Sequence, residues 1–303
     1  MKLPCRKYYT TNNGILYQGD CAKVIQQKLK DQKFDLIFTS PPFPLNRSKE
    51  YGNMTGEEYI KWFKAFAKPF SDMLSDTGSI VIEIGNVWEK GLPVHSTLPM
   101  EALLAFKREA NLYLCEEFIY YNPARLPSPI EWVNKKRIRT KDSFSRIWWM
   151  SKTPYPKSDN RNVLEEYSKQ MKKLIKSGKY NSGIRPSEYI IGDESFSKDN
   201  GGAIPSNVLI ASNTVSNSSY IKYCKDNNYS IHPARMPKEI VEFFVKLLTV
   251  ENDSVLDPFS GSNTTGYVCE YLNRKWVGIE KNEEYIRGSI GHFTNVKKVA
   301  KDG

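Results

Sequence analysis

The sequence predicts an α/β protein built on a doubly wound, mostly parallel sheet of seven strands. Two observations support this fold class. Short apolar runs alternate along the chain with longer stretches that have helical apolar spacing. Two of the apolar runs also end in turns with polar side chains, as strands do at the ligand-binding edge of such sheets. The 303 residues are enough for one domain of this kind with a large insertion.

The elements follow from local periodicity, taken in chain order. The expected strands are short runs rich in β-branched and aromatic residues, namely Ile15–Gln18, Phe34–Thr39, Ser79–Ile84, Glu117–Tyr121, Ile147–Met150, Ser254–Leu256 and Trp276–Ile279. The expected helices place apolar residues at intervals of three and four, and they are Cys21–Lys30, Glu57–Leu74, Lys238–Leu248 and Asn263–Leu272.

Residues 153–225 interrupt this regular pattern. Prolines, a Gly-Gly pair and runs rich in Ser and Asn replace the periodicity, which predicts a loop-rich insertion. One helix is expected within it, Val163–Ile175, whose lysines form a basic face that is equally typical of a solvated helix surface. The chain is therefore divided into residues 1–152, 153–225 and 226–303.

Composition restricts the function classes. Lys and Arg total 44 against 34 Asp and Glu, a net charge of +10 that favours a polyanionic partner without requiring one. The five cysteines show no metal-type spacing and the three histidines form no cluster, so reduced thiols and no metal site are expected. No apolar run is long enough for a bilayer, and the first residues do not resemble a secretory leader. A cytoplasmic location is therefore expected.

The first motif is the strand 34–39 followed by Ser40-Pro41-Pro42-Phe43. Two consecutive prolines fix φ and remove backbone donors, which leaves rigidly oriented carbonyls beside a hydroxyl and an aromatic ring. These groups suit a planar base that carries an amine, with oxygens to accept its N–H groups and a ring to stack on it. Taken alone, the tetrapeptide also fits a simple strand-ending turn.

The second motif is a strand that runs into D-P-F-S-G-S-N-T-T-G, a loop of small residues starting at Asp257. Gly261 allows close approach of a ligand to the backbone, and Asn263 or Thr264 can cap the helix that follows. Glu280 ends the next strand, 23 residues after Asp257. An acid in that position holds ribose hydroxyls in nucleotide-binding folds. The glycine fingerprints of NAD- and ATP-binding loops are absent from the sequence.

Both motifs together resemble the amino-methylating DNA methyltransferases. Their order, with S-P-P-F before D-P-F-S-G, matches the circularly permuted class called beta. Segments that begin at Leu126, Ser195 and His232 are similar to segments of the PvuII-type cytosine-N4 methylases of restriction-modification systems. The resemblance covers nearly the whole chain and implies the fold of S-adenosylmethionine-dependent methyltransferases.

The resemblance implies roles for individual residues. A serine at the first position of the tetrapeptide favours the N4 amine of cytosine over the N6 amine of adenine. The Ser40 hydroxyl and the Pro41 carbonyl are then acceptors for the amine, Pro42 stiffens the turn, and Phe43 stacks on the base. The residues implied to hold S-adenosyl-L-methionine are Asp20, Asp257, Phe259, Gly261, Ser262 and Glu280. Asp20 is equally well explained as a helix N-cap, and His232 is expected to be structural.

Double-stranded DNA is the implied partner. A basic run is expected to contact its phosphates, although a solvated charged face remains an alternative; the run consists of Lys135, Lys136, Arg137 and Arg139. The insertion 153–225 is expected to choose the target sequence, and the target base is expected to flip out of the helix. The family also implies a partner restriction endonuclease.

Three other activities remain open at this point. They are adenine-N6 methylation, DNA binding without catalysis, and methylation of RNA or protein. The residues Ser40, Asp257 and Glu280 argue against a protein without catalysis. The sequence does not indicate an oligomeric state or a recognition sequence.

Overall fold

The computed structural model describes residues 5–43, 56–178, 183–184, 186–192, 198–212 and 217–299. The chain divides into two compact units, which are described separately. One unit consists of Met1–Ser158 and Asn207–Gly303, and the other is Asp159–Ser206. No helix in the described ranges is both long and apolar enough to cross a membrane.

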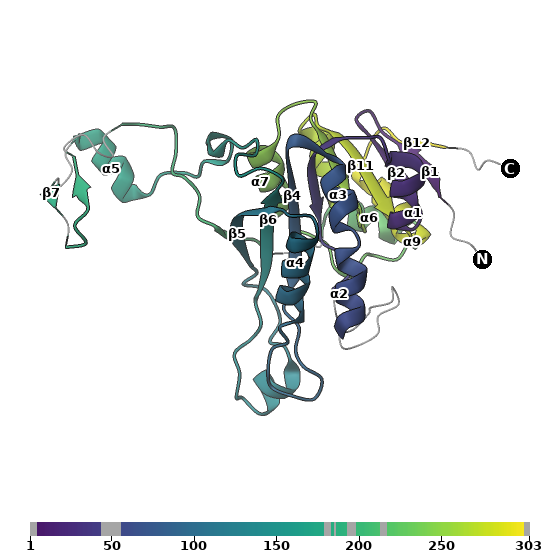
Figure 1. Ribbon diagram of the computed structural model, residues 1–303, viewed down its shortest axis with the longest axis horizontal. Coiled ribbons are helices and arrows are strands. Elements are labelled where there is room, and N and C mark those ends of the chain that lie inside the picture. Colours follow the sequence, from purple (N-terminus) through teal and green to yellow (C-terminus); the bar gives the residue numbers. More distant parts are fainter. Residues whose placement is uncertain are drawn as a thin grey trace. The chain divides into compact units, whose positions relative to one another are not determined.

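The larger unit is built on one sheet, whose described strands have the order β12-β1-β2-β11-β10-β3-β4-β6-β5-β9 (Figure 1). The strands from β2 to β4 in this order are parallel, and β6 runs antiparallel to both of its neighbours. The strand bounds are β1 Arg6–Thr10, β2 Gly14–Gln18, β3 Phe34–Thr39, β4 Leu74–Gly85, β5 Tyr113–Tyr121, β6 Phe144–Ser151, β9 Val208–Ile210, β10 Ser254–Asp257, β11 Lys275–Glu280 and β12 Lys297–Lys298.

All seven predicted strands are present in a mostly parallel sheet, which confirms the predicted fold class. The predicted number of strands was wrong, because β1, β9 and β12 extend the sheet to ten strands within the described residues. These three lie at or next to the sheet edges. The strands β9 and β12 are three and two residues long, and β1 buries only one of its five residues. Such short, poorly buried segments have no apolar run for a sequence pattern to detect.

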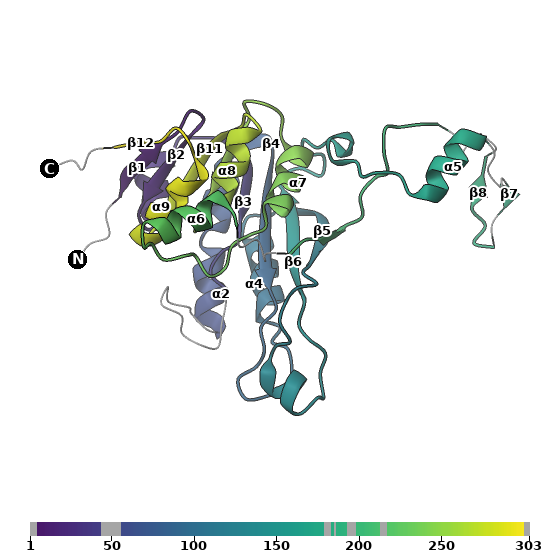
Figure 2. The ribbon, with the colours of Figure 1, turned by 180° about the vertical axis from the view of Figure 1, so that it is seen from behind.

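Helices cover both faces of the sheet, as Figures 1 and 2 show from opposite sides. Helices α1 to α4 pack on one face around a large aromatic core, whereas α7 and α8 pack on the other. The helices of this unit are α1 Cys21–Val24 with the π-helical turn η1 Ile25–Leu29, α2 Gly56–Lys64, α3 Ala67–Asp72, α4 Leu98–Glu109, the π-helical turn η2 Glu131–Lys135, α6 Ser219–Asp226, α7 Lys238–Leu248, α8 Thr264–Tyr271, α9 Glu283–Ser289 and the 3₁₀ turn η4 Ile290–His292.

The predicted helix Glu57–Leu74 is divided into α2 and α3 in the structure. Pro69 lies in the first turn of α3 and has no N–H group, so the hydrogen bond that a continuous helix would form with Ala65 is missing. A helix can begin around such a proline but is interrupted before it. Leu74 is the first residue of β4 and lies outside the helix.

The second unit, Asp159–Ser206, contains the 3₁₀ turn η3 Asn160–Val163, helix α5 Lys169–Ser177 and the short pair β7 Gly183–Ile184 and β8 Ile190–Ile191. The prediction that a helix starts at Val163 was wrong. Ser168 is the N-cap, with its hydroxyl accepting from the Met171 amide at 3.1 Å, while Glu165 pairs with Ala203 in extended conformation. Residues 207–212 and 217–225 belong to the larger unit, where they contribute β9 and most of α6.

Candidate active site

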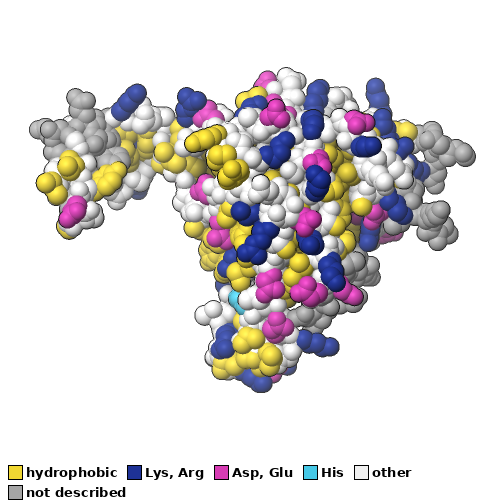
Figure 3. Space-filling model, in the orientation of Figure 1, with side chains coloured by type: hydrophobic (Ala, Val, Ile, Leu, Met, Phe, Trp, Pro, Cys, Tyr) yellow, Lys and Arg dark blue, Asp and Glu magenta, His cyan; other side chains and the backbone are white. Residues whose placement is uncertain are grey.

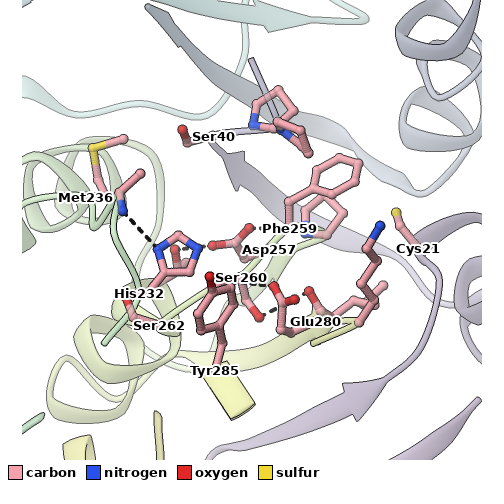
Figure 4. Close-up of a pocket in the computed structure, with 18 of the residues that line it drawn as sticks. Cys21, Ser40, His232, Met236, Asp257, Phe259, Ser260, Ser262, Glu280 and Tyr285 are labelled. Carbon is pink, nitrogen blue, oxygen red and sulfur yellow. Dashed lines mark hydrogen bonds between the residues drawn. The ribbon is translucent and has the colours of Figure 1, made fainter. Parts of the chain in front are cut away.

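A cavity of about 330 Å³ lies at the carboxyl ends of the central parallel strands. This is the edge at which ligands bind in open α/β sheets. The ten residues that the sequence assigns to catalysis and to the cofactor all line it, and Figure 4 shows several of them. They are Asp20, Ser40, Pro41, Pro42, Phe43, Asp257, Phe259, Gly261, Ser262 and Glu280.

The two motifs meet because β3 and β10 are parallel neighbours in the sheet. Asp257 accepts hydrogen bonds from the Thr39 hydroxyl at 3.0 Å, the Thr265 hydroxyl at 2.6 Å and the Phe259 amide at 3.2 Å. Burial raises the pKa of Asp257 to about 6, and these hydrogen bonds counteract part of that rise. The carboxyl group therefore joins β3, the small-residue loop and α8 at the base of the cavity.

The loop after β10 is held mainly through its backbone. Glu280 accepts from the Gly261 amide at 3.0 Å and from the Asn282 amide at 2.8 Å. Burial raises the pKa of Glu280, whereas these backbone hydrogen bonds lower it. Gly261 has φ +50°, and a Cβ atom there would lie 2.9 Å from Nε2 of His232. Asn263 caps α8 by accepting from the Gly266 amide, as one of the two expected caps.

The tetrapeptide depends on a partner from the next strand. The Ser40 hydroxyl donates to Oε2 of Glu83 at 2.7 Å, and Glu83 on β4 is only 3% exposed. Burial raises the pKa of Glu83, and hydrogen bonds from Ser40 and Ser145 together with the charge of Arg125 lower it. Because a hydroxyl has one hydrogen and two lone pairs, this bond leaves the Ser40 oxygen free to act as an acceptor.

Arg125 and Ser145 support Glu83 from behind. The Arg125 guanidinium donates from Nη2 to the Ser145 hydroxyl at 2.8 Å and from Nη1 to the Phe144 carbonyl at 3.1 Å. This cluster was not predicted from the sequence. A signal was present, because Glu83 is the one charged residue in the apolar run Ser79–Ile84, and a charge at such a position needs partners.

Aromatic rings form another part of the cavity wall. Phe259 packs against Trp62 and Phe66, with ring centroids 5.7 Å and 5.4 Å apart. The Phe43 ring lies against Gly85, where an added Cβ atom would be 3.0 Å from the ring. Trp62 and Phe66 come from the α2 region and carry no sequence motif, so no pattern in the sequence indicated them.

Asp20 and His232 make structural contacts and also line the cavity. Asp20 is the N-cap of α1, with its side chain accepting from the Lys23 amide at 3.2 Å, and it also lines the cavity. Both interpretations of Asp20 are therefore compatible with its position. His232 lines the cavity as well, and its ring packs edge-on against Tyr285 at 4.5 Å.

The basic run lies away from the cavity, in a projection that we call the edge lobe, residues 86–97 and 122–143. Lys135 and Lys136 are 3.2 Å and 3.8 Å from the Glu131 carboxylate. Lys136 also lies over the Trp132 ring, 4.5 Å from its centroid. The Arg139 guanidinium donates to the Pro93 and Ile138 carbonyls. Arg137 adopts a left-handed conformation with φ +54°.

The fold and the strand-end cavity, together with the family model that matches the chain, define a DNA-modifying methyltransferase. The family model described as DNA methylase, N6_N4_Mtase, matches residues 34–291, and the chain belongs to this family. Type II methyltransferase M.PvuII of Proteus hauseri is 46% identical over 94% of this chain and 85% of its own length. Type II methyltransferase M.BglII of Bacillus subtilis is 28% identical over 89% of this chain and 66% of its own.

A comparison with a solved structure supports the same family assignment. The PvuII DNA methyltransferase (cytosine-N4-specific) matches with a TM-score of 0.76 and 37% identity, over 97% of this chain and 91% of that chain.

Proposed function

We propose that this protein is a site-specific DNA methyltransferase that transfers a methyl group from S-adenosylmethionine to the exocyclic N4 of cytosine. The observation that carries the proposal is the position of Ser40, whose acceptor oxygen faces the same cavity as the loop 257–262. The 46% identity to M.PvuII and the match to the cytosine-N4-specific PvuII enzyme support the same choice of base.

The cavity fits S-adenosylmethionine by its chemistry. Carboxylates of Asp20 and Glu280 provide acceptors for hydroxyl and amine groups, and the aromatic ring of Phe259 provides an apolar wall. The left-handed Gly261 leaves space beside His232 that a side chain would fill. Glu280 is suited to the ribose hydroxyls, because its two oxygens offer about four lone-pair sites and the backbone amides of Gly261, Lys281 and Asn282 do not use all of them.

Bound S-adenosylmethionine supplies an electrophilic methyl group, and the residues of this chain prepare the amine for it. The lone pair of the cytosine N4 is delocalised into the ring, which makes the amine a poor nucleophile. Acceptance of its two hydrogens by the Ser40 oxygen and the Pro41 carbonyl favours a pyramidal nitrogen with an available lone pair. Pro42 keeps these oxygens fixed.

Proton removal follows methyl transfer in this proposal. The methylated nitrogen carries a positive charge and passes one proton to the Ser40 oxygen, while the Ser40 hydrogen passes to Oε2 of Glu83. Burial raises the pKa of Glu83, which makes its carboxylate a better proton acceptor than an exposed one. Ser40 therefore does not need to act as a base before the reaction.

DNA contacts are assigned to separate regions. The base must leave the duplex to reach the cavity, and Phe43 is placed to stack on it. The basic residues Lys135, Lys136, Arg137 and Arg139 are assigned to phosphate contacts. The unit Asp159–Ser206, which lies within the predicted insertion 153–225, is assigned to target choice. Pairing with a restriction endonuclease is part of this proposal, in line with the type II names of the relatives.

Methylation of a mixed-sequence DNA library, followed by base-resolution mapping of the product, tests the proposal. We expect N4-methylcytosine at one short recognition sequence. N6-methyladenine as the product would contradict the assignment of Ser40 to cytosine. Absence of any methyl incorporation from labelled cofactor would instead indicate a DNA-binding protein without catalysis, and preferential methylation of RNA would change the substrate class.

A further inference from the structure

The edge lobe carries several exposed apolar side chains. Leu126 is 82% exposed and Ile130 is 62% exposed. The side chains of Leu92, Val94 and Ile138 on the lobe are also exposed, and we call these five residues the apolar tip. Hydrophobic side chains gather at the lower end of the view in Figure 3. Single exposed apolar residues are common, but five of them on one small lobe indicate an interaction surface.

The backbone beneath the apolar tip is well ordered by hydrogen bonds. The Trp132 and Val133 amides donate to the Pro129 carbonyl at 3.2 Å and 3.0 Å, and the Ile138 amide donates to the Trp132 carbonyl at 2.9 Å. The Asp142 amide donates to the Ser128 carbonyl at 3.0 Å, which closes the base of this loop. The apolar side chains are therefore held outward by a structured turn.

The charge around the tip indicates which partner covers it. The edge lobe contains seven basic residues against three acidic ones. The basic residues are Lys90, Arg125, Lys135, Lys136, Arg137, Arg139 and Lys141. Two such tips would repel each other in a symmetric dimer, whereas a nucleic acid backbone complements them. An apolar group surrounded by Lys and Arg is also the composition of the wedges that proteins insert between base steps.

The edge lobe is also attached to the edge of the sheet that carries the cavity. It leaves the sheet after Gly85 of β4 and after Tyr121 of β5, and it returns at Phe144 of β6 (Figure 1). Gly85 is in contact with Phe43, and Arg125 at the lobe base reaches the Ser145 hydroxyl beside Glu83. A duplex that delivers a base to the cavity therefore meets the lobe at the same time.

We propose that Leu126 and Ile130 insert into the target duplex beside the flipped base and replace the stacking that is lost there. The inference rests on the proposed function and adds a role that phosphate contacts do not provide. Flipping costs unpairing and unstacking energy, and burial of two exposed aliphatic side chains between bases offsets part of that cost. The contribution should be largest when the target is fully paired.

The test compares the parent enzyme with the double variant Leu126→Ser/Ile130→Ser on two duplexes. One carries the mapped recognition site with its normal guanine opposite the target, and the other has an abasic site there. We expect kcat/KM of the double variant to fall at least tenfold on the paired duplex and by no more than about threefold on the abasic duplex, because the abasic site removes the pairing cost. Leu126→Phe should retain most activity.

Val250→Ser is the matched control, because Val250 is a similarly exposed aliphatic residue just before β10, at the amino ends of the parallel strands. The Val250→Ser variant should leave kcat/KM unchanged on both duplexes.

Unchanged kcat/KM in the double variant, or equal losses on both duplexes, would overturn the proposal that Leu126 and Ile130 insert into the duplex. A change in oligomeric state of the double variant with unaltered kinetics would indicate a protein partner instead. If the parent methylates neither duplex, the proposed function itself fails. Unchanged cofactor affinity and melting temperature exclude misfolding, and the single variant Leu126→Ser repeats the test if the double variant is unstable.

Discussion

The two halves of the cavity are built in different ways. On the cofactor side, Glu280 holds the loop through the backbone amides of Gly261 and Asn282. On the catalytic side, Ser40 is held by the side chain of Glu83, which in turn depends on Ser145 and Arg125. A backbone-bonded loop tolerates many side-chain changes, whereas a chain of buried polar side chains depends on every member.

This difference indicates that the two halves of the cavity have different roles in the reaction. The cofactor side has to present a fixed shape to a ligand that is the same in every turnover. The catalytic side has to hold an acceptor oxygen and also receive a proton, and side chains can change protonation state where backbone amides cannot. Variants in each half should therefore affect different kinetic quantities.

The largest expected effect comes from Ser40→Ala. Loss of one acceptor directed at developing charge should lower kcat by a factor of about 100 to 1000, by analogy with oxyanion-hole deletions. Cofactor affinity should stay within a few-fold of the parent, because Ser40 contacts the amine. Single-turnover kinetics and calorimetry measure the two quantities, and a variant with normal turnover would remove Ser40 from the mechanism.

Asp257→Asn tests the carboxyl group that connects the two halves of the cavity by hydrogen bonds. The pKa of Asp257 is raised to about 6 from its usual value of 3.8, so the folded protein binds more protons than the unfolded chain in that interval. The stability of the parent should therefore fall as pH rises from about 4 to 6, by up to about 3 kcal/mol from this group. The asparagine variant lacks this contribution, so relative to the parent it should gain stability between pH 4 and pH 7. Urea unfolding at both pH values measures the difference, and an unchanged difference would contradict the raised pKa.

Glu280→Ala should act on the cofactor side alone. Ribose hydroxyls would lose a charged acceptor, and hydrogen bonds to charged groups contribute roughly 1.5–3 kcal/mol, so affinity for S-adenosylmethionine should fall about ten- to hundredfold. At saturating cofactor, kcat should remain near that of the parent. Glu280→Gln keeps one of the two acceptor oxygens, so it should lose less affinity than the alanine variant. A selective loss of kcat in the alanine variant would contradict the proposed division.

The smallest effect is expected for Arg125→Met. Removal of the positive charge should raise the already raised pKa of Glu83, so more of the carboxylate is protonated at low pH. The pH at which kcat falls on the acidic side should then be higher than in the parent. A shift of one pKa unit lowers kcat about tenfold at pH values below the new pKa and leaves kcat at alkaline pH unchanged. Lys246→Met, which removes the same charge on α7, is the control. A uniform fall of kcat at every pH would indicate only a structural role for Arg125.

The sequence by itself determined the parallel strands and the two motifs, and through the family resemblance it also indicated ten of the residues that line the cavity. These features are local, since a buried strand that ends in a rigid or small-residue turn has a recognisable pattern. The parallel strands also predicted that the first motif lies at the ligand-binding edge of the sheet. The pairing of β3 with β10, which brings Ser40 and Asp257 to one cavity, was established by the structure.

Only the tertiary structure decided which side chains meet between elements. Glu83 reaches Ser40 because β3 and β4 pair in a particular register, and Arg125 reaches Ser145 because the edge lobe folds back onto β6. The apolar tip likewise depends on two segments, 86–97 and 122–143, that are separated along the chain. Sequence periodicity records the face of an element and its boundaries, but register and long-range packing are collective properties of the folded chain.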